Sequence, residues 1–229
     1  MSIIQAKNIY KVYNETHVPV HALNGVDLEI EKGEFTAIVG PSGSGKTTLL
    51  NIIGGLDLPT EGDIFIEGTN LKTLSSRQLI DFRLHNIGFV FQAYNLIPVL
   101  TALENTEFIL ELQGVSKKER EKRAMEILKT VDIADKRDHK PGQLSGGQQQ
   151  RVAVARALVS QPKYIIADEP TANLDSKSTE ELLTLMKKMN EKFQTTFVFA
   201  THDQRVMDKA RRIITIEDGK AVKDETFER

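Results

Sequence analysis

The residues Gly40-Pro41-Ser42-Gly43-Ser44-Gly45-Lys46-Thr47-Thr48 match the pattern G-x-x-x-x-G-K-S/T. The short apolar run Phe35–Val39 before them predicts a buried strand, and Lys46–Ile53 has the pattern of a helix. Glycines let a backbone curl until successive N–H groups point at phosphate oxygens, and the N-terminus of the following helix adds its positive end. Lys46 is then expected at the β- and γ-phosphates, and Thr47 offers a hydroxyl to Mg²⁺. The stretch predicts a nucleotide-binding loop.

Predicted strands and helices alternate on both sides of this loop. Alternating or apolar runs predict strands at Ile3–Tyr13, Val26–Ile30, Asp63–Glu67, Ile87–Phe91, Tyr164–Ala167, Thr196–Ala200 and Ile213–Glu217. Apolar residues also recur at helical spacing between the fifth and sixth of these runs, at Leu182, Leu183, Met186 and Met189. Such alternation predicts an α/β fold with a parallel sheet that is covered on both faces.

The middle of the chain differs from the rest. Lys117–Val131 is rich in charge but carries apolar residues on one face, which predicts an amphipathic helix, and Gly147–Val159 is also helical. We therefore expect a helical insertion over approximately residues 93–161, within a single domain that spans residues 1–229.

Composition narrows the class of protein. With 27% charged residues and a net charge of −2, the chain resembles an ordinary globular protein and not a constitutive nucleic-acid binder. The absence of cysteine excludes disulfides, thiolate zinc sites and a cysteine nucleophile. Met1–Lys7 lacks the apolar core of a signal peptide, and no stretch approaches the roughly 20 apolar residues that span a bilayer. A membrane role would depend on a partner.

Two acids end the apolar run Tyr164–Ala167. Carboxylates at the carboxyl end of a strand lie where ligands bind in open α/β sheets. Asp168 is expected to help hold Mg²⁺, through water, and Glu169 to polarise an attacking water as a general base. Without the nucleotide-binding loop, a strand that runs into a solvated acidic turn would be the better explanation of these acids.

The stretch Leu144-Ser145-Gly146-Gly147-Gln148 begins a second helix with the features of an anion site. Ser145 is a natural N-cap, and the two glycines leave the N–H groups of the first turn bare. An ordinary capped helix would explain the serine but not the glycines.

With both motifs and the acidic strand end in place, the sequence resembles the ABC ATPase family over nearly its whole length. The resemblance implies a P-loop NTPase fold with a mainly parallel core sheet, an N-terminal antiparallel β subdomain and an inserted α-helical subdomain. It implies ATP and Mg²⁺ as ligands. It also implies a head-to-tail dimer of two copies, in which Leu144–Gln148 of one copy caps the γ-phosphate that the other copy binds.

The resemblance assigns roles to individual residues. It implies catalytic roles for Glu169, His202 and Gln92, and Mg²⁺ binding by Thr47, Gln92 and Asp168. It implies nucleotide binding by Tyr13, Gly40, Pro41, Ser42, Gly43, Ser44, Gly45, Lys46, Thr47, Thr48, Ser145, Gly146, Gly147, Gln148 and Asp175.

Four of these residues lie outside the two glycine-rich motifs. Tyr13 resembles the aromatic residue that stacks on adenine, although a tyrosine at a strand end can also be structural. Gln92 resembles the glutamine that reaches Mg²⁺ and the attacking water, and the segment after it is implied to face a membrane partner. His202, after Thr196–Ala200, resembles the switch histidine at the γ-phosphate. Asp175 resembles the dimer-communication aspartate, and it could equally cap the helix that starts at Ser176.

Two longer stretches refine the resemblance. Asn51–Gly62 and Phe89–Asn105 are similar to the branch that serves lipoprotein release and macrolide or antimicrobial-peptide export. This branch implies integral membrane permease subunits as partners, and a peripheral position on the cytoplasmic face of the inner (plasma) membrane.

Two other classes of protein explain the sequence less well. A soluble ABC ATPase that acts on nucleic acid or ribosomes would need long coiled coils or a second ATPase domain, and this chain has one set of motifs. A P-loop kinase for a small molecule would leave Leu144–Gln148 unexplained.

Overall fold

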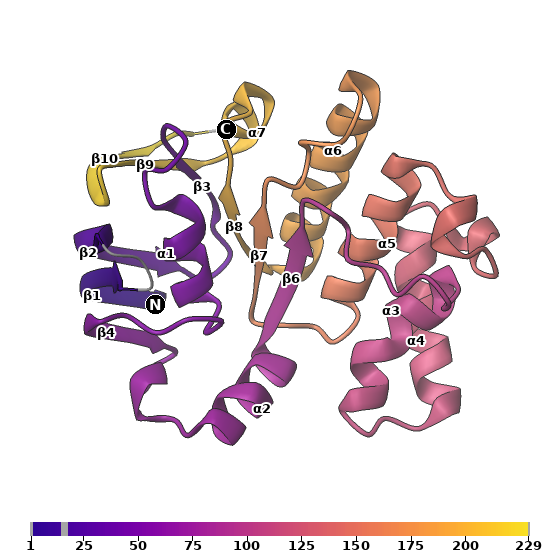
Figure 1. Cartoon of the computed structure of the whole chain (residues 1–229). Coiled ribbons are helices and arrows are strands. Elements are labelled where there is room, and N and C mark those ends of the chain that lie inside the picture. The colour runs from indigo at the N-terminus through magenta and orange to yellow at the C-terminus, as the bar shows by residue number, and fades with distance from the viewer. Residues whose placement is uncertain (1, 15–17, 229) are drawn as a thin grey trace. The chain divides into compact units, whose positions relative to one another are not determined.

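The computed structural model describes residues 2–14 and 18–228, and it divides into two compact units. The first unit comprises Met1–Arg83 and Thr196–Arg229, and the second comprises Leu84–Thr195 (Figure 1). In the part of the chain that the structure describes, no helix combines the length and the apolar character needed to cross a bilayer.

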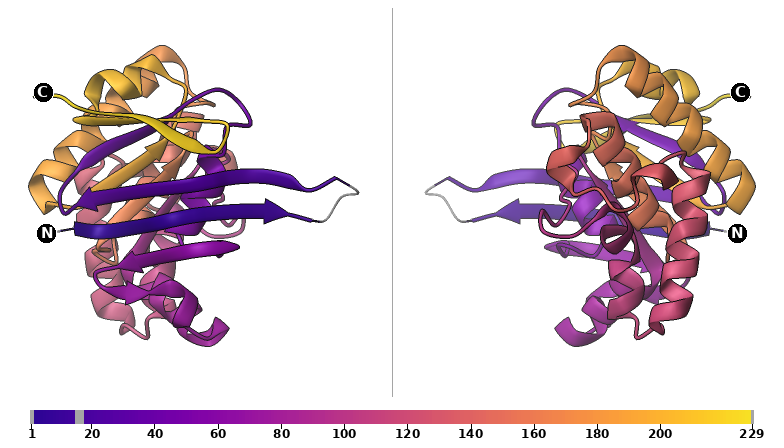
Figure 2. Two further views of the ribbon diagram at one scale, coloured as in Figure 1. Left: turned by 90° about the vertical axis from the view of Figure 1, so that its left-hand side faces the viewer. Right: turned by 90° about the vertical axis from the view of Figure 1, so that its right-hand side faces the viewer.

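An antiparallel sheet forms one layer of the first unit. Its strands follow the order β2-β1-β4-β5, with bounds β1 (Ser2–Tyr13), β2 (Val20–Glu31), β4 (Glu61–Ile66) and β5 (Thr69–Asn70). β1 pairs with β2 and β4 on its two sides, and the three strands run side by side in Figure 2. Buried residues alternate with exposed ones at the carboxyl end of β2, as expected when one face of a sheet covers a core.

A second sheet in this unit carries the predicted nucleotide-binding loop at residues 40–48, called the phosphate loop below. Its strand order is β10-β9-β3-β8, with bounds β3 (Phe35–Val39), β8 (Thr196–Ala200), β9 (Arg212–Glu217) and β10 (Lys220–Thr226). β3 is parallel to both β8 and β9, and every residue of β3 and β8 is buried. The rings of Phe35 and Phe199 pack with centroids 4.6 Å apart. Helices α1 (Lys46–Ile53) and α7 (Gln204–Lys209) follow β3 and β8, and α2 (Ser76–Asn86) runs into the second unit.

The second unit combines a parallel strand pair with helices. β6 (Ile87–Phe91) pairs with β7 (Tyr164–Asp168). The helices are α3 (Ala102–Leu112), α4 (Lys117–Thr130), α5 (Gly146–Leu158) and α6 (Ser176–Phe193). α5 is central, because it contacts α3, α4, α6 and β6. Its buried side chains are mainly small or β-branched, which lets neighbouring elements approach closely.

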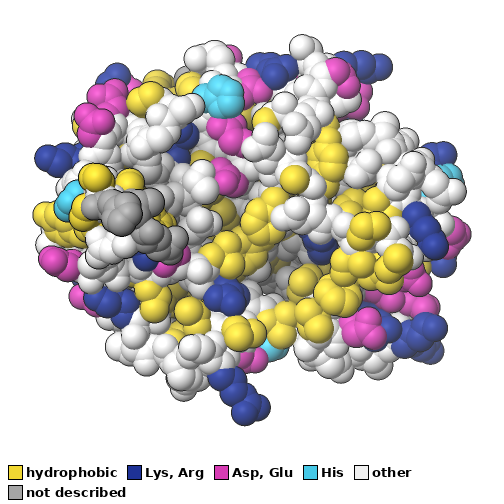
Figure 3. Space-filling view, in the orientation of Figure 1, with side chains coloured by type: hydrophobic (Ala, Val, Ile, Leu, Met, Phe, Trp, Pro, Cys, Tyr) yellow, Lys and Arg dark blue, Asp and Glu magenta, His cyan; other side chains and the backbone are white. Residues whose placement is uncertain are grey.

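The predicted fold is confirmed, with several differences in detail. β3, α1, β6 and β8 have the predicted bounds. β2 begins at Val20 and not at the predicted Val26. The prediction missed the start of this strand because its first residues are exposed and show no regular alternation of apolar and polar side chains. The sequence pattern did not predict α2 or β10 either, since α2 buries none of its residues and β10 is an exposed edge strand. Acidic and basic side chains are interspersed on the face that Figure 3 shows.

Candidate nucleotide site

The phosphate loop lies between β3 and α1 in the first unit. A Cβ atom on Gly40 would lie 2.0 Å from the Ile216 carbonyl oxygen, and one on Gly45 would lie 2.4 Å from that of Ala22. Both glycines also have positive φ angles, of 148° and 105°. Only glycine satisfies both constraints, so the loop's path depends directly on these two residues.

The side chain of Lys46 folds back onto the backbone of this loop. Its Nζ donates hydrogen bonds of 2.9 Å to the carbonyl oxygens of Gly40 and Pro41. The ammonium group is thereby held at the mouth of the loop, at the N-terminus of α1, where the helix adds its positive end. Ser44 contributes a buried hydroxyl oxygen that has no hydrogen-bond partner among the described residues. A cationic loop with an unsatisfied buried hydroxyl fits a phosphate chain.

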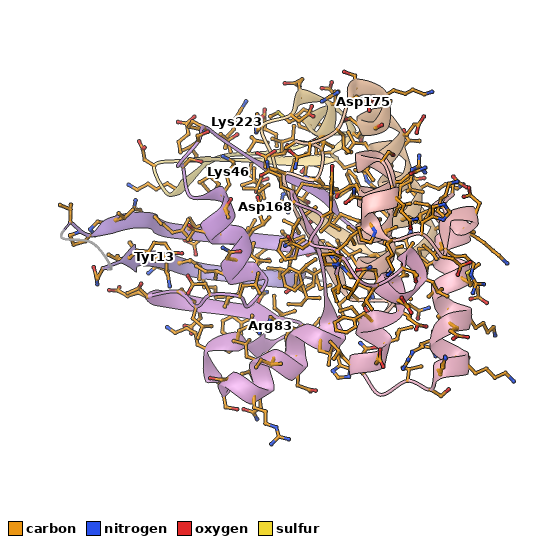
Figure 4. The ribbon with its side chains drawn as sticks, turned by 45° about the vertical axis from the view of Figure 1, so that its right-hand side comes forward. Tyr13, Lys46, Arg83, Asp168, Asp175 and Lys223 are labelled. Atoms are coloured by element: carbon orange, nitrogen blue, oxygen red, sulfur yellow. The ribbon has the colours of Figure 1, made fainter. Side chains whose placement is uncertain are left out.

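Tyr13 lies at the same cavity as the loop. The cavity has a volume of about 270 Å³ and is lined by Tyr13, Val20, His21, Ala22, Gly43, Gly45, Lys46, Thr47 and Thr48. Figure 4 labels Tyr13 at the end of β1 and Lys46 at the start of α1. An aromatic ring and a phosphate loop at one cavity are what a nucleotide with a flat base requires.

Asp57 fixes the position of Tyr13, and no pattern in the sequence indicated this role. The Tyr13 hydroxyl donates a hydrogen bond of 2.9 Å to Asp57 Oδ2, and Lys11 Nζ lies 2.6 Å from Asp57 Oδ1 and 4.9 Å from the centre of the Tyr13 ring. Partial burial would raise the pKa of Asp57, but hydrogen bonds from Lys11 and Tyr13 outweigh it and hold this pKa below its ordinary value.

His202 follows β8 at the same edge of the sheet as the loop. β8 is the parallel neighbour of β3, with Ala200 opposite Ile38, and the Thr201 N–H donates to the Ile38 carbonyl oxygen at 3.1 Å. His202 is exposed there, immediately before Asp203, which caps α7. The structure therefore places this histidine in the first unit together with Lys46.

In the second unit, Gln92 and the two acids emerge from neighbouring strands. Phe91 and Asp168 are register partners in the parallel pair of β6 and β7, so Gln92 and Glu169 leave the sheet side by side. Glu169 has a φ angle of 45°, which non-glycine residues seldom adopt. The Asn173 side-chain amide donates to the Gln92 carbonyl oxygen at 2.9 Å. The sequence did not indicate this bond.

The stretch Leu144–Gln148 begins α5 with a capping box. Ser145 Oγ accepts from the Gln148 N–H at 3.3 Å, and Gln148 Oε1 accepts from the Ser145 N–H at 2.9 Å. A Cβ atom on Gly146 would lie 2.8 Å from the Tyr94 hydroxyl. The start of α5 opens on a cavity of about 740 Å³, lined by Asp132, Ser145, Gly147, Gln148, Arg151, Ser178, Glu180, Glu181, Thr184, Leu185 and Lys188.

Asp175 caps α6, which is one of the two roles that the sequence left open. Its carboxylate accepts from the N–H groups of Lys177 and Ser178 at 3.0 Å and from Ser178 Oγ at 2.7 Å. The hydrogen bonds from Ser178 hold the pKa of Asp175 below its ordinary value. Figure 4 labels Asp175 at the start of α6.

The loop after Gln92 is held by Arg156 of α5. The guanidinium donates to the carbonyl oxygens of Tyr94 and Asn95, at 2.8 and 2.5 Å. Both accepting residues have positive φ angles, of 58° and 49°. Burial lowers the pKa of Arg156. A half-buried cation that donates to two carbonyl groups fixes the path of this loop, and nothing in the sequence pattern singled Arg156 out.

The residues present fit Mg²⁺ as well as a nucleotide. Among the residues that the structure describes, no group of three histidine or acidic side chains could hold a metal by itself. Mg²⁺ typically binds one or two carboxylates together with substrate phosphates. A hydroxyl from Thr47, an amide oxygen from Gln92 and the Asp168 carboxylate are oxygen donors of the required kind.

Comparisons with known proteins found a matching family model, similar proteins and a similar solved structure. A family model described as "ABC transporter" matches residues 23–172. The chain is 43% identical over 217 residues to the lipoprotein-releasing system ATP-binding protein LolD of Legionella pneumophila, covering 95% of this chain and 96% of that protein. It is 45% identical over 224 residues to the macrolide export ATP-binding/permease protein MacB of Brucella melitensis, where it spans 98% of this chain but 34% of the relative.

A solved structure is similar over the whole chain. It is the dimeric structure of a post-hydrolysis state of the ATP-binding cassette MJ0796 bound to ADP and Pi, and MJ0796 is a protein of Methanocaldococcus jannaschii. The TM-score is 0.90 at 47% sequence identity, and the match covers 99% of each chain.

Proposed function

This chain belongs to the ABC transporter family, and on that premise we propose that it is the ATP-binding and ATP-hydrolysing subunit of an ABC transporter. The observation that carries the proposal is that one chain has two helix N-termini with glycine-rich starts suited to bind a phosphate. One is the loop before α1, closed by Lys46, and the other is the capped start of α5 at Ser145.

The first terminus would bind ATP within one copy. Lys46 and the N–H groups of the loop residues Gly40, Pro41, Ser42, Gly43, Ser44, Gly45, Thr47 and Thr48 would bind the phosphates, and the ring of Tyr13 would stack on the base. Bound Mg²⁺, held by Thr47, Gln92 and Asp168, would neutralise phosphate charge.

The chain's own side chains would then act on water. Glu169 would take the proton of the attacking water, and Gln92 would orient that water. His202 would contact the γ-phosphate. Each of these three residues directly follows, or lies two residues beyond, the carboxyl end of a parallel strand, which is where ligands bind in α/β sheets.

The second terminus would complete the site of another copy. Ser145, Gly146, Gly147 and Gln148 would cap the γ-phosphate bound by the partner, in a head-to-tail dimer that also involves Asp175. Self-dimerisation is supported by the dimeric structure of the similar cassette. We further propose that residues 93–161, which contain α3, α4 and α5, form the helical signature subdomain of one ATPase domain spanning residues 1–229.

The membrane partners are proposed from two similar proteins, LolD and MacB. LolD and MacB serve lipoprotein release and macrolide export, so we propose that this chain drives a membrane permease in lipoprotein release or in macrolide or antimicrobial-peptide export. It would lie peripherally on the cytoplasmic face of the inner (plasma) membrane. Affinity capture with detergent-solubilised membranes tests this, and enrichment of nucleic acid alone would contradict it.

The enzymatic part is tested by Glu169→Gln. We expect Mg²⁺-dependent ATP hydrolysis to fall by about 10²-fold or more, since a general base contributes on the order of 10²–10⁴ in rate. Gel filtration with ATP and Mg²⁺ should then show a trapped dimer. The control is Glu126→Gln, on the exposed face of α4, which should retain the wild-type rate. Full turnover in Glu169→Gln would show that the role of Glu169 is misassigned.

A further inference from the structure

Gln150 is a fully buried polar residue of α5, the helix that Ser145 caps. Its side chain is 0% exposed, and its Nε2 donates a hydrogen bond of 2.8 Å to the Pro170 carbonyl oxygen. Its Oε1 is also buried, and it has no hydrogen-bond partner among the described residues. An apolar side chain of similar volume would fill this place without an unsatisfied oxygen. Packing alone therefore does not explain an amide here.

The peptide that Gln150 contacts is next to Glu169. Pro170 directly follows Glu169, whose φ angle of 45° is unusual for any residue with a side chain. A residue before proline is further restricted, because the proline ring clashes with its backbone. Such a backbone persists only where its surroundings fix it. The hydrogen bond from Gln150 to the Pro170 carbonyl oxygen is one such constraint, and it acts on the residue directly after Glu169.

Gln150 also lies one helical turn from Gly146. Residues four positions apart lie on the same face of a helix, so Gly146 and Gln150 share one face of α5. This face meets the loops that follow β6 and β7. A Cβ atom added to Gly146 would lie 2.8 Å from the Tyr94 hydroxyl and 3.7 Å from the Asn173 carbonyl oxygen. A displacement at the start of α5 would therefore be carried to the peptide that follows Glu169.

We infer that Gln150 is a positioning residue that couples the two nucleotide sites of the dimer. The inference rests on the proposed function, in which Ser145 of one chain binds the partner's nucleotide and Glu169 of the same chain acts on its own. The hydrogen bond from Gln150 to Pro170 links the helix that begins after Ser145 to the peptide that follows Glu169. Capping of one nucleotide thus sets the position of the general base at the other.

The test compares the ATP dependence of hydrolysis in two variants with the same change. Gln150→Met removes the donor but keeps the volume. Gln113→Met is the matched control, because Gln113 Nε2 also donates 2.8 Å to a backbone carbonyl oxygen, that of Leu84, away from this network. The wild-type chain and Gln113→Met should show a Hill coefficient above 1. Gln150→Met should bring it to about 1 and lower kcat on the order of ten-fold, because a general base acts only in its correct geometry.

A second variant keeps the test decisive if Gln150→Met fails to fold. In Gln150→Glu, burial raises the pKa of the carboxyl, and the protonated form can still donate to Pro170. Cooperativity should be kept near pH 6 and lost near pH 9, while Gln113→Met stays constant over that range.

The outcomes separate this inference from the proposed function. Folded Gln150→Met with an unchanged Hill coefficient overturns the inference alone, and so does a wild-type chain that hydrolyses ATP without cooperativity. A wild-type chain that hydrolyses no ATP overturns the proposed function, and the coupling falls with it. A trapped dimer in the double variant Glu169→Gln, Gln150→Met supports a role in coupling and not in assembly.

Discussion

The side-chain amide of Asn173 donates a hydrogen bond of 2.9 Å to the backbone carbonyl oxygen of Gln92. These residues are 81 positions apart in the chain, and they follow neighbouring parallel strands. The Tyr94 hydroxyl lies 3.4 Å from the Asn173 carbonyl oxygen, so the two loops contact each other at more than one point. The position of Gln92 therefore depends on the loop that leads to Asp175.

Asn173→Asp should separate catalysis from binding. The change keeps the shape of the side chain but removes the donor to Gln92. We expect kcat to fall on the order of ten-fold with little change in KM for ATP, because Gln92 is proposed to act on the water and Mg²⁺ and not on the base or sugar. Gln113→Glu, which removes an equivalent amide donor elsewhere, should leave both constants near the wild-type values. An increase in KM with unchanged kcat would contradict this role of Asn173.

Tyr13→Ala should weaken ATP binding more than Tyr13→Phe. Stacking between rings contributes about 0.5–1.5 kcal/mol, so loss of the ring should raise the Kd for ATP by up to about ten-fold. Phenylalanine keeps the ring and loses only the hydrogen bond to Asp57, and we expect about a two-fold change. Equilibrium titration with a fluorescent ATP analogue measures both. Equal effects of the two variants would show that Tyr13 is structural.

Ser145→Arg should spare nucleotide binding and block dimer closure. The N-cap lies at the exposed start of α5, where a long cationic side chain removes the cap and fills the approach of a phosphate. In a Glu169→Gln background, we expect unchanged ATP affinity and a monomer in sedimentation. Ser116→Arg changes another helix N-cap serine, one without a side-chain cap hydrogen bond, and should still dimerise. A dimer of Ser145→Arg would indicate that this terminus does not lie at the interface.

Glu107 should make stability decrease as pH rises. Burial raises its pKa above the ordinary value of 4.5, although Arg120 opposes the shift with an Nε to Oε1 distance of 3.4 Å. A raised carboxyl pKa contributes stability that is fully present below the unfolded value and is lost as pH rises through the folded value. Glu107→Gln should therefore show a smaller decrease in Tm between pH 4.5 and pH 7 than the wild type. Glu126→Gln removes an exposed carboxyl that does not influence Glu107, and it should keep the wild-type slope.

Local sequence predicted much of this protein because the constraints are local. A phosphate loop needs glycine at Gly40 and Gly45, where a side chain would meet the backbone of other strands. Buried parallel strands need continuous apolar runs, and so Phe35–Val39 and Thr196–Ala200 were found at their correct bounds. The serine cap of α5 lies within four residues of its partners. Exposed elements such as α2 and β10 have no such pattern, so they could not be predicted.

The tertiary structure decided which side chains hold the candidate site residues in place. Asp57 reaches Tyr13 across 44 positions, Asn173 reaches Gln92 across 81, and Gln150 reaches Pro170 across 20. Each of these contacts requires a strand register or a helix packing that no local pattern encodes. The sequence by itself therefore determined the two glycine-rich helix starts that are the candidate phosphate sites, and the strand ends. Only the packed structure determined the hydrogen bonds that fix their geometry, because hydrogen-bond direction and length depend on how distant elements meet.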